Sequence, residues 1–179
     1  MHHSHYGLGR DFTSNRTRLA AAGYVFGERI VSSTLSRDAS TTTQMKSADT
    51  NVLVAALLTR HQDSATARVV RAVVEGRITP VKSNEIMAEY REVLARPHFH
   101  FPGGSVERIL AVVESDGIEL SPRSVDFDFP DESDRVFFEV AFSGESLGTR
   151  LVTGNQKHYP FSPIVISPAE MMKMLDGER

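Results

Sequence analysis

The chain has 179 residues, of which 40% are hydrophobic, and its formal net charge at pH 7 is -3. This length suits one domain with one hydrophobic core, and the weak charge gives no sign of a strongly basic nucleic-acid-binding protein. The absence of cysteine excludes disulfides, thiolate metal sites and cysteine nucleophiles. No run approaches the roughly 18 apolar residues of a membrane span, and no secretory signal opens the chain, so we expect a cytoplasmic protein without membrane association.

Residues 1–44 differ in composition from the rest of the chain. They contain three early histidines, a run of three threonines and no proline. Within them, only Arg18 to Ile30 has the character of a weak helix, and Met45 offers an alternative start. We therefore expect a flexible or mis-started extension. The alternative is a copper or nickel site formed by the terminal amine and His3.

From Met45 onward, strand and helix patterns alternate. Short apolar runs predict strands, and amphipathic runs bounded by serine, glycine or proline predict helices. Alternating strands and helices imply right-handed crossovers and a parallel sheet covered on both faces. The predicted strands are Lys46 to Asp49, Ile78 to Val81, Ile118 to Leu120, Arg150 to Thr153 and Ile164 to Ile166; the predicted helices are Val52 to Thr59, Ala65 to Glu75, Ser83 to Ala95, Ser105 to Ser115, Glu132 to Phe142 and Pro168 to Leu175.

Asp49 is predicted to end the first strand, with Thr50 or Asn51 as the cap of the helix that follows. Ligands of open parallel sheets bind beyond the carboxyl ends of the strands, so a carboxylate there is placed for chemistry. One carboxylate binds a metal poorly, and several bind it well. The acids at comparable junctions are Glu89, Asp134 and Asp131.

Helical phase selects Glu89 among the acids of its helix. It lies at the edge of the apolar stripe, three residues after Ile86 and four before Val93, whereas the other two glutamates of this helix point toward water. Glu89 is therefore the acid that we expect to face a crevice. The alternative is a boundary glutamate in a surface pair with Arg91 or Arg96.

Asp134 is predicted on the buried face of the next acidic helix. Phe137, Phe138 and Ala141 bracket the direction in which its side chain projects. Burial of an unpaired charge is costly, and a bound cation would compensate it. The alternative is that Asp134 or Asp131 caps the helix.

Three inward carboxylates near strand ends suit a hard cation with oxygen ligands, Mg²⁺ or Mn²⁺. Such an ion generates hydroxide from bound water and holds a phosphate oxygen. Phosphodiester hydrolysis is therefore the reaction class that this set of residues serves best, and no side-chain nucleophile is required.

Three other α/β classes fit less well. A haloacid-dehalogenase-like phosphatase needs a second acid two residues after the first, where this chain has Asn51. A phosphate-receiver domain needs an acidic pair near the first strand, and the acids here are distributed differently. The pair Gly103-Gly104 is too short for a nucleotide-binding loop, and no Lys-Thr or Lys-Ser follows it.

Two further sets of residues each allow two interpretations. His98 and His100, flanked by phenylalanines, are either a metal pair or base-stacking patch, or simply the cover of an apolar edge. Arg150, Lys157 and His158 either meet phosphate along a groove or belong to a solvated loop.

The chain resembles a PIN-domain ribonuclease of the kind that forms the toxin component of bacterial toxin-antitoxin systems. The resemblance covers Met45 to about Leu175, and it depends on the order and spacing of motifs that are weak one by one. These motifs are Ala48-Asp49-Thr50-Asn51-Val52-Leu53-Val54, Ser83 with Ile86, Glu89-Tyr90, Val93-Leu94, Arg96-Pro97, Asp131-Glu132-Ser133-Asp134, Phe137-Phe138-Glu139-Val140-Ala141, Leu151-Val152-Thr153-Gly154-Asn155 and Ile164-Val165-Ile166-Ser167-Pro168.

The resemblance implies that residues 45–179 form a PIN domain with a three-layer α/β/α fold, in which helices flank a central parallel sheet. It implies a Mg²⁺- or Mn²⁺-dependent endoribonuclease. Matched position by position, the catalytic and metal-binding acids are Asp49, Glu89 and Asp134, with Asp131 as an additional metal ligand. The residues that match small polar groups lining the same crevice, and that would bind substrate, are Thr50, Asn51, Ser83 and Thr153.

The sequence departs from the family pattern after Thr153. Many members have an aspartate there, where this chain has Gly154-Asn155. Asn155 supplies a carbonyl oxygen to a metal but no charge, which favours one firmly bound ion over two. The resemblance also implies RNA as substrate, a cognate antitoxin protein as partner and, as in many members, a homodimer. The alternative is a PIN-like scaffold that binds RNA or a partner protein without cleavage.

Overall fold

The computed structural model describes residues 44–177. Residues 1–43 of the predicted extension, with the weak helix and the alternative copper or nickel site at His3, lie outside the described residues. The predicted bound of residue 44 is wrong by one position, because Gln44 begins the first strand. Within 44–177, no helix is both long and apolar enough to cross a membrane.

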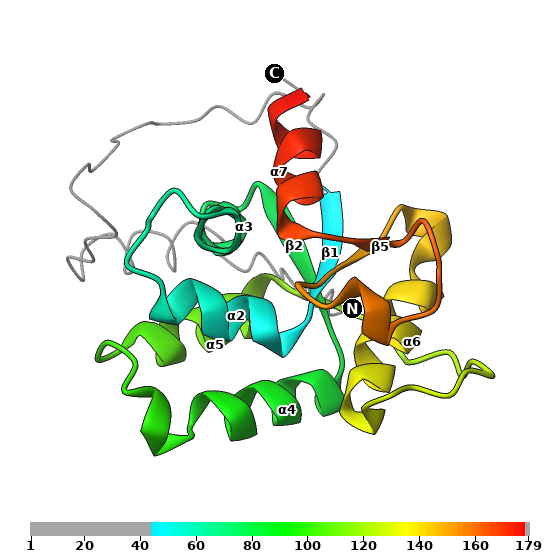
Figure 1. Ribbon diagram of the computed structural model, residues 1–179, viewed down its shortest axis with the longest axis horizontal. Helices are drawn as coiled ribbons and strands as arrows, with labels where there is room; N and C mark the ends of the chain where they lie inside the picture. Colours follow the sequence, from blue (N-terminus) through cyan, green and yellow to red (C-terminus); the bar gives the residue numbers. More distant parts are fainter. Residues whose placement is uncertain (1–43, 178–179) are drawn as a thin grey trace, which may run out of the picture. The chain divides into compact units, whose positions relative to one another are not determined.

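The described elements follow the predicted alternation to within one or two residues at most boundaries (Figure 1). The chain forms strands and helices in the order β1 (Gln44–Ala48), α2 (Thr50–Leu58), α3 (Ala65–Val74), β2 (Ile78–Lys82), α4 (Asn84–Leu94), α5 (Ser105–Asp116), β3 (Ile118–Glu119), α6 (Arg135–Ser143), β4 (Arg150–Val152), β5 (Val165–Ile166) and α7 (Pro168–Gly177). Four short 3-10 turns join them: η1 (Pro97–Phe99), η2 (Glu132–Asp134), η3 (Glu145–Leu147) and η4 (Gln156–His158).

Two predicted boundaries are wrong in ways that affect the acids. Helix α2 begins at Thr50, and its cap is Asp49 rather than Thr50 or Asn51, because the Asp49 carboxylate accepts the N–H of Asn51. The predicted helix from Glu132 is divided into η2 and α6, since the Asp131 carboxylate caps a separate turn. Asp134 therefore ends η2 and precedes α6 instead of lying inside one continuous helix.

All five strands of the described chain run parallel, in the order β3-β2-β1-β4-β5. The chain moves from β1 outward to β2 and β3, then returns to the other side of β1 to add β4 and β5. The order therefore reverses at β1. In open parallel sheets, the crevice for ligands lies beyond the carboxyl ends of the strands at such a reversal.

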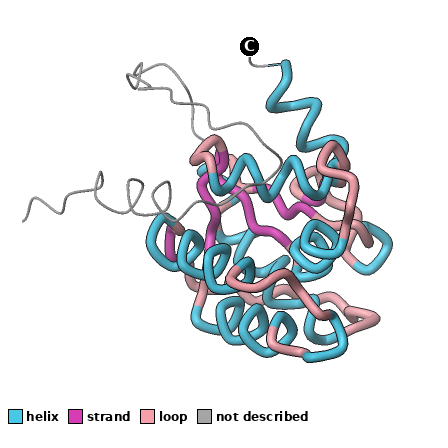
Figure 2. Tube along the Cα trace, turned by 90° about the vertical axis from the view of Figure 1, so that its left-hand side faces the viewer, coloured by secondary structure: helices cyan, strands magenta, loops and turns pink. Residues whose placement is uncertain are grey.

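Successive strand residues alternate between two apolar cores. Leu151 and Val165 contribute to the core that contains the phenylalanines of α6, whereas Val152 and Ile166 contribute to the core that contains the apolar residues of α7. Figure 2 shows helices on both sides of the strands. Residues 44–177 thus confirm the predicted three-layer α/β/α fold, with five parallel strands and six α-helices.

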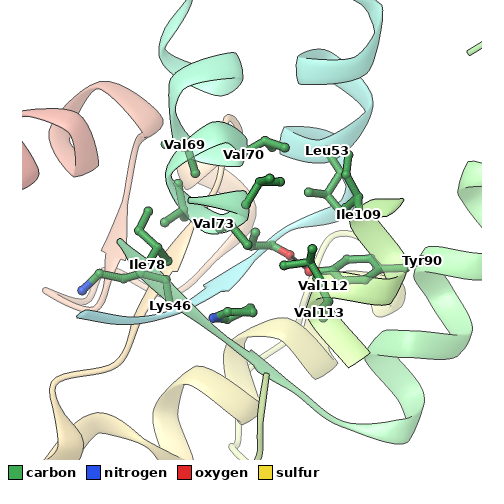
Figure 3. A pocket seen from close by; sticks show the side chains of 14 residues that line it. Lys46, Leu53, Val69, Val70, Val73, Ile78, Tyr90, Ile109, Val112 and Val113 are labelled. Atoms are coloured by element: carbon green, nitrogen blue, oxygen red, sulfur yellow. Dashed lines mark hydrogen bonds between the residues drawn. The ribbon is translucent and has the colours of Figure 1, made fainter. Parts of the chain in front are cut away.

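A pocket between α3, α5 and the sheet is apolar and belongs to the core. Val69, Val73 and Val112 point into it, and none of the candidate acids lines it (Figure 3). The Tyr90 ring of α4 forms part of its wall, and the Tyr90 hydroxyl donates to the carbonyl of Ala48. This bond fixes α4 to the last residue of β1, directly before Asp49.

Candidate active site

Four hydrogen bonds hold the Asp49 carboxylate in one orientation. Asp49 is only 3% exposed. Its Oδ1 accepts from the backbone N–H of Asn51 at 3.2 Å. Its Oδ2 accepts from the Asn51 side-chain amide at 2.8 Å, from the Thr153 hydroxyl at 2.9 Å and from the Tyr159 hydroxyl at 2.8 Å. All four donors are uncharged, so these bonds orient the carboxylate without neutralising it.

The register of β1 and β4 explains the contact between Asp49 and Thr153, which are 104 positions apart. Ala48 pairs with Val152, and the N–H of Asp49 donates to the carbonyl of Val152 at 3.0 Å. In a parallel pair, the residues that follow two paired positions also lie side by side. The first residue beyond each strand therefore faces the other across the crevice.

Asp134 is buried at the junction of η2 and α6, with 9% exposure. Nδ1 of His158 lies 3.0 Å from its Oδ2 in a hydrogen bond. Burial raises the pKa of Asp134, and the neighbouring Asp49 raises it further, whereas the contact with His158 acts in the opposite direction. The structure thus brings a second buried carboxylate into the electrostatic field of Asp49.

Glu89 lies half-buried on α4. Burial is the main cause that raises its pKa, and the nearby acids Glu92, Asp131 and Asp49 raise it further, while Arg96 opposes them. Acids on α2, α4 and η2 therefore influence one another electrostatically. In the absence of a cation, Asp49 and Asp131 make ionisation of both Glu89 and Asp134 less favourable.

The alternative interpretation of Glu89 as a partner in a surface ion pair is wrong for this structure. Arg96 pairs with Glu92 at 2.7 Å, and Arg91 pairs with Glu114. In the described residues, Glu89 forms neither a hydrogen bond nor an ion pair through its carboxylate. Its oxygens are therefore available to a ligand.

Asp131 behaves as the predicted cap. Its exposed carboxylate accepts the N–H of Ser133 at 3.0 Å and the Ser133 hydroxyl at 2.8 Å. These two bonds lower the pKa of Asp131. Asp131 still raises the pKa values of Glu89 and Asp134, which places it at the rim of the same acidic group.

The predicted polar residues differ in how directly they contact the Asp49 carboxylate. Asn51 and Thr153 contact its carboxylate directly, and the backbone of Asn155 donates to the Thr153 hydroxyl at 3.0 Å. The Asn155 side chain is partly exposed. Thr50 is buried beside Asp49, and its hydroxyl has no hydrogen-bond partner among the described residues.

Ser83 has a mainly structural position. It follows β2 and caps α4, because its Oγ accepts the N–H of Ile86 at 3.2 Å. The Ser83 hydroxyl also donates to the Glu85 carboxylate, and this bond helps to lower the pKa of Glu85. Ser83 thus lies at the carboxyl edge of the sheet without contact to Asp49 in the structure.

Sequence reasoning missed Tyr159. Turn η4 directs this side chain into the core, where it is 4% exposed and packs edge-on against Phe129, with 6.2 Å between ring centroids. Burial beside two carboxylates, Asp49 and Asp134, raises the pKa of its hydroxyl, which keeps it a neutral donor. The available signal was a tyrosine shortly after the Thr153 strand, since a buried tyrosine needs a partner for its hydroxyl.

The structure shows where the two sets of residues with two interpretations each lie. His158 pairs with Asp134, whereas Arg150 begins β4 and donates to the carbonyl of Thr149, at the strand end opposite Thr153. The structure therefore does not bring Arg150 to the acids. Phe101 packs against the core that contains the phenylalanines of α6, whereas His98 and His100 are exposed, in agreement with the simpler interpretation that this segment covers an apolar edge.

The donor set fits a hard divalent cation. The acids supply oxygen ligands, and the burial of Asp134 and Glu89 leaves their negative charge poorly solvated. Within residues 44–177, no three His, Cys, Asp or Glu side chains lie close enough to hold one ion together. Magnesium, however, keeps several waters and needs only one or two carboxylates. Asp49 and Asp134, which both interact with the Tyr159 hydroxyl, fit as that pair.

Comparison with known proteins agrees with this arrangement. A family model described as PIN domain matches residues 48–157, a range that includes Asp49, Glu89 and Asp134 and ends before Tyr159. Searches among curated proteins and among solved structures gave no significant match. Because the match covers more than half of the chain, the protein belongs to the PIN-domain family, whose members are typically metal-dependent nucleases.

Proposed function

We propose that this protein is a Mg²⁺- or Mn²⁺-dependent endoribonuclease that hydrolyses RNA phosphodiesters. The observation that carries the proposal is the buried Asp49 carboxylate, which four neutral donors orient at the reversal point of the sheet, in the field of Asp134. Family membership supports a metal-dependent nuclease. RNA as the substrate is the further step.

In this proposal, Asp49, Glu89 and Asp134 are the catalytic acids. Asp49 and Asp134 would hold the ion directly, and Asp131 and Asn155 would contribute at the rim. When bound, the ion would lower the pKa of a water molecule and neutralise charge on the phosphate.

The surrounding residues position these acids. Asn51, Thr153 and Tyr159 occupy Oδ2 of Asp49, whereas Oδ1 accepts a single backbone hydrogen bond. Oδ1 therefore has the free lone pair that a cation needs. His158 fixes Oδ2 of Asp134 in the same way.

Substrate would be held by the small polar residues of the crevice. The Thr50 hydroxyl, which has no partner in the described chain, would bind a phosphate oxygen or a water. Asn51, Thr153 and Ser83 would line the path of the strand. A buried donor without a partner is costly, so a ligand at Thr50 would remove that cost.

We further propose that residues 45–179 act as the PIN-domain toxin of a toxin-antitoxin pair in the cytoplasm, as a homodimer. This role rests on family analogy. A cognate antitoxin would cover the acidic crevice and insert a basic side chain. Expression should arrest growth, and a neighbouring gene should relieve the arrest; harmless expression of a protein that cleaves RNA in vitro would contradict the role.

A catalytically weak scaffold is the second candidate. It is favoured by Asn155, which lacks the charge that many family members have at this position, and by the wide spacing of the acids. Such a protein would bind RNA or a partner protein without cutting it.

The deciding experiment is cleavage of a mixed single-stranded RNA panel by the full chain, with Mn²⁺, with Mg²⁺ and with chelator. Asp49→Asn is the inactive control, and Glu145→Gln, an exposed acid on η3, is the matched control that should retain activity. Metal-dependent cleavage that only Asp49→Asn loses supports the ribonuclease. Folded protein that cuts in neither metal supports the scaffold.

A further inference from the structure

The strap, defined as residues 123–129, runs beside α6 and leads into η2 (Figure 1). Alternate side chains of the strap face the core, namely Val125, Phe127 and Phe129, and the two aspartates between them are exposed. This period of two is typical of an extended chain with one face on the core. The strap belongs to none of the five described strands, so its backbone groups need partners outside the sheet.

Two side chains of α6 supply these partners. The Arg135 guanidinium donates to the carbonyl of Val125 at 3.1 Å and to the carbonyl of Phe127 at 3.0 Å. The carboxylate of Glu139, which is one turn further along α6, accepts the N–H of Val125 at 3.1 Å. Arg135 and Glu139 also pair with each other, with 3.5 Å between Nη1 and Oε1. A charged pair of α6 therefore holds the strap in place of a strand ladder.

Arg135 also holds η2 and Phe129. Its Nε donates to the Glu132 carboxylate, and its Nη2 donates to the same carboxylate at 3.3 Å. The Cζ atom of Arg135 lies over the Phe129 ring, 4.8 Å from the centroid. A planar fork with five donors can serve strap, turn and ring at once, whereas a lysine ammonium is a compact point charge. Arg135 therefore closes the segment from Val125 to Asp134, which carries two of the candidate acids.

Phe129 transmits this restraint to the first acid. Its ring packs edge-on against Tyr159, with 6.2 Å between centroids. Phe138 contacts both rings, at 6.0 Å from Phe129 and 6.5 Å from Tyr159. All three side chains are buried, and a close-packed interior transmits the displacement of one ring to its neighbours. The position of Phe129 therefore limits the position of the Tyr159 hydroxyl, which donates to Asp49 at 2.8 Å.

The charge of Arg135 is used within the segment that it closes. In the described chain, its ion pairs are with Glu132 and Glu139. Arg135 follows Asp134 directly, but the charges with the largest effect on the pKa of Asp134 belong to other acids and to His158. An effect of Arg135 on the metal site is therefore one of geometry.

We propose that Arg135 is a positioning residue of the metal site. By holding the strap on α6, it keeps Phe129 against Tyr159, and Tyr159 orients the Asp49 carboxylate. The inference rests on the proposed function, because Asp49 is the acid that holds the ion there. It adds a residue that touches neither metal nor substrate and whose loss lowers the affinity for the ion.

The test measures the Mn²⁺ affinity of the full chain by calorimetry, under conditions in which urea unfolding curves show each variant to be folded. Arg135→Lys keeps the positive charge and loses the fork, so it should weaken Mn²⁺ binding by about tenfold, the smaller effect of a residue outside the ligand set. Arg135→Gln should weaken it as much. Arg123→Lys is the matched control and should bind like wild type, because Arg123 also stacks from the strap onto α6, with its Cζ atom 3.8 Å from the Phe142 centroid.

A merely structural role of Arg135 would lower the stability and leave the Mn²⁺ affinity of folded molecules unchanged. Wild-type affinity in Arg135→Lys would therefore overturn the proposal. Weaker binding in Arg135→Gln alone would also overturn it, since charge and not the fork would then be the cause. If neither variant folds, Phe129→Leu removes the same ring contact from the other side and should show the same loss; wild-type affinity there would overturn the proposal.

The double variant Arg135→Lys with Tyr159→Phe tests the route to the acid. Tyr159→Phe already removes the hydroxyl that Arg135 positions, so the second substitution should cost less than about tenfold in this background. Losses that multiply in full would exclude a route through Tyr159 and overturn the proposal.

Cleavage assays of the same variants distinguish this inference from the proposed function. Mn²⁺ binding that depends on Arg135, in a chain that cleaves no RNA, would remove the ribonuclease and retain the positioning role. Metal-dependent cleavage with the same Mn²⁺ requirement in Arg135→Lys and wild type would do the reverse. When both proposals hold, the Mn²⁺ concentration for half-maximal cleavage should rise in Arg135→Lys by the same factor as the dissociation constant.

Discussion

The Tyr159 hydroxyl donates a 2.8 Å hydrogen bond to Oδ2 of Asp49 across 110 positions of sequence. This bond comes from outside the segment that matches the PIN-domain family model. It joins the loop after β4 to the acid at the end of β1. The same loop pairs His158 with Asp134, so one short segment positions both buried carboxylates.

The substitution Tyr159→Phe should affect metal binding and cleavage more than the stability of the fold. Tyr159→Phe removes one buried hydrogen bond, which should lower the free energy of unfolding by about 1 to 2 kcal/mol. Loss of a partner that orients a metal-binding acid should also reduce metal affinity or cleavage by about 10- to 100-fold. Urea unfolding, calorimetric Mn²⁺ titration and cleavage rates measure the three quantities.

Tyr90→Phe is the matched control for this prediction, because Tyr90 also loses a buried hydrogen bond, here to the carbonyl of Ala48. It should reduce stability by a similar amount and leave metal affinity near that of wild type. Equal metal affinities for Tyr159→Phe and wild type would show that the bond serves packing alone.

Divalent ions should stabilise the folded protein through the acids. At 100 times the dissociation constant, a bound ion adds about 2.7 kcal/mol to the free energy of unfolding. Thermal unfolding should therefore shift upward with Mn²⁺, and chelator should reverse the shift. Asp49→Asn and Asp134→Asn should lose it, whereas Asp63→Asn, in the loop between α2 and α3, should keep it. A shift of wild-type size in Asp49→Asn would place the ion elsewhere.

Without a divalent ion, the stability of the protein should depend on pH through Asp134 and Glu89. Their pKa values are raised in the fold above the ordinary 3.8 and 4.5. The folded state therefore binds the proton more tightly than the unfolded state, so this contribution is complete below the ordinary values and is lost as pH rises through the raised ones.

Asp134→Asn should accordingly have a higher free energy of unfolding than wild type at pH 7 in chelator. The expected difference is up to about 1 kcal/mol after allowance for solvent screening. The two proteins should approach each other in stability near pH 4. Denaturant titrations at both pH values give the comparison, and a variant less stable than wild type at pH 7 would mean that the contact with His158 outweighs the cost of burial.

Restoration of an acid at position 155 should strengthen the metal site. The backbone of Asn155 is fixed to the Thr153 hydroxyl, which itself contacts Asp49, so a carboxylate here would enter the same crevice. Asn155→Asp should tighten Mn²⁺ binding by about tenfold, or 1.4 kcal/mol. Asn155→Ala separates added charge from loss of the amide; tighter binding in both variants would exclude charge as the cause.

Local sequence patterns predicted most elements and their bounds, and also which acids of α4 are exposed. Ser64 and Gly76 bound α3 as predicted, since a side-chain oxygen accepts a free N–H at a helix start and glycine adopts the positive φ of 72° after its end. The phase of α4 placed Glu89 at the boundary and its neighbouring acids in water. These features depend on residues within about four positions of one another.

Only the tertiary structure decided which side chains meet. The short apolar run of β4 predicts a buried strand. The position of β4 beside β1, and the pairing of Ala48 with Val152, depend on the packing of the whole sheet. That register brings Thr153 to Asp49, and the path of the following loop brings Tyr159 and His158 to the two acids. Contacts over more than 100 positions leave no periodic pattern in the local sequence. The sequence by itself therefore determined the fold class and the place of Asp49 at a strand-to-helix junction, whereas packing determined which side chains surround Asp49.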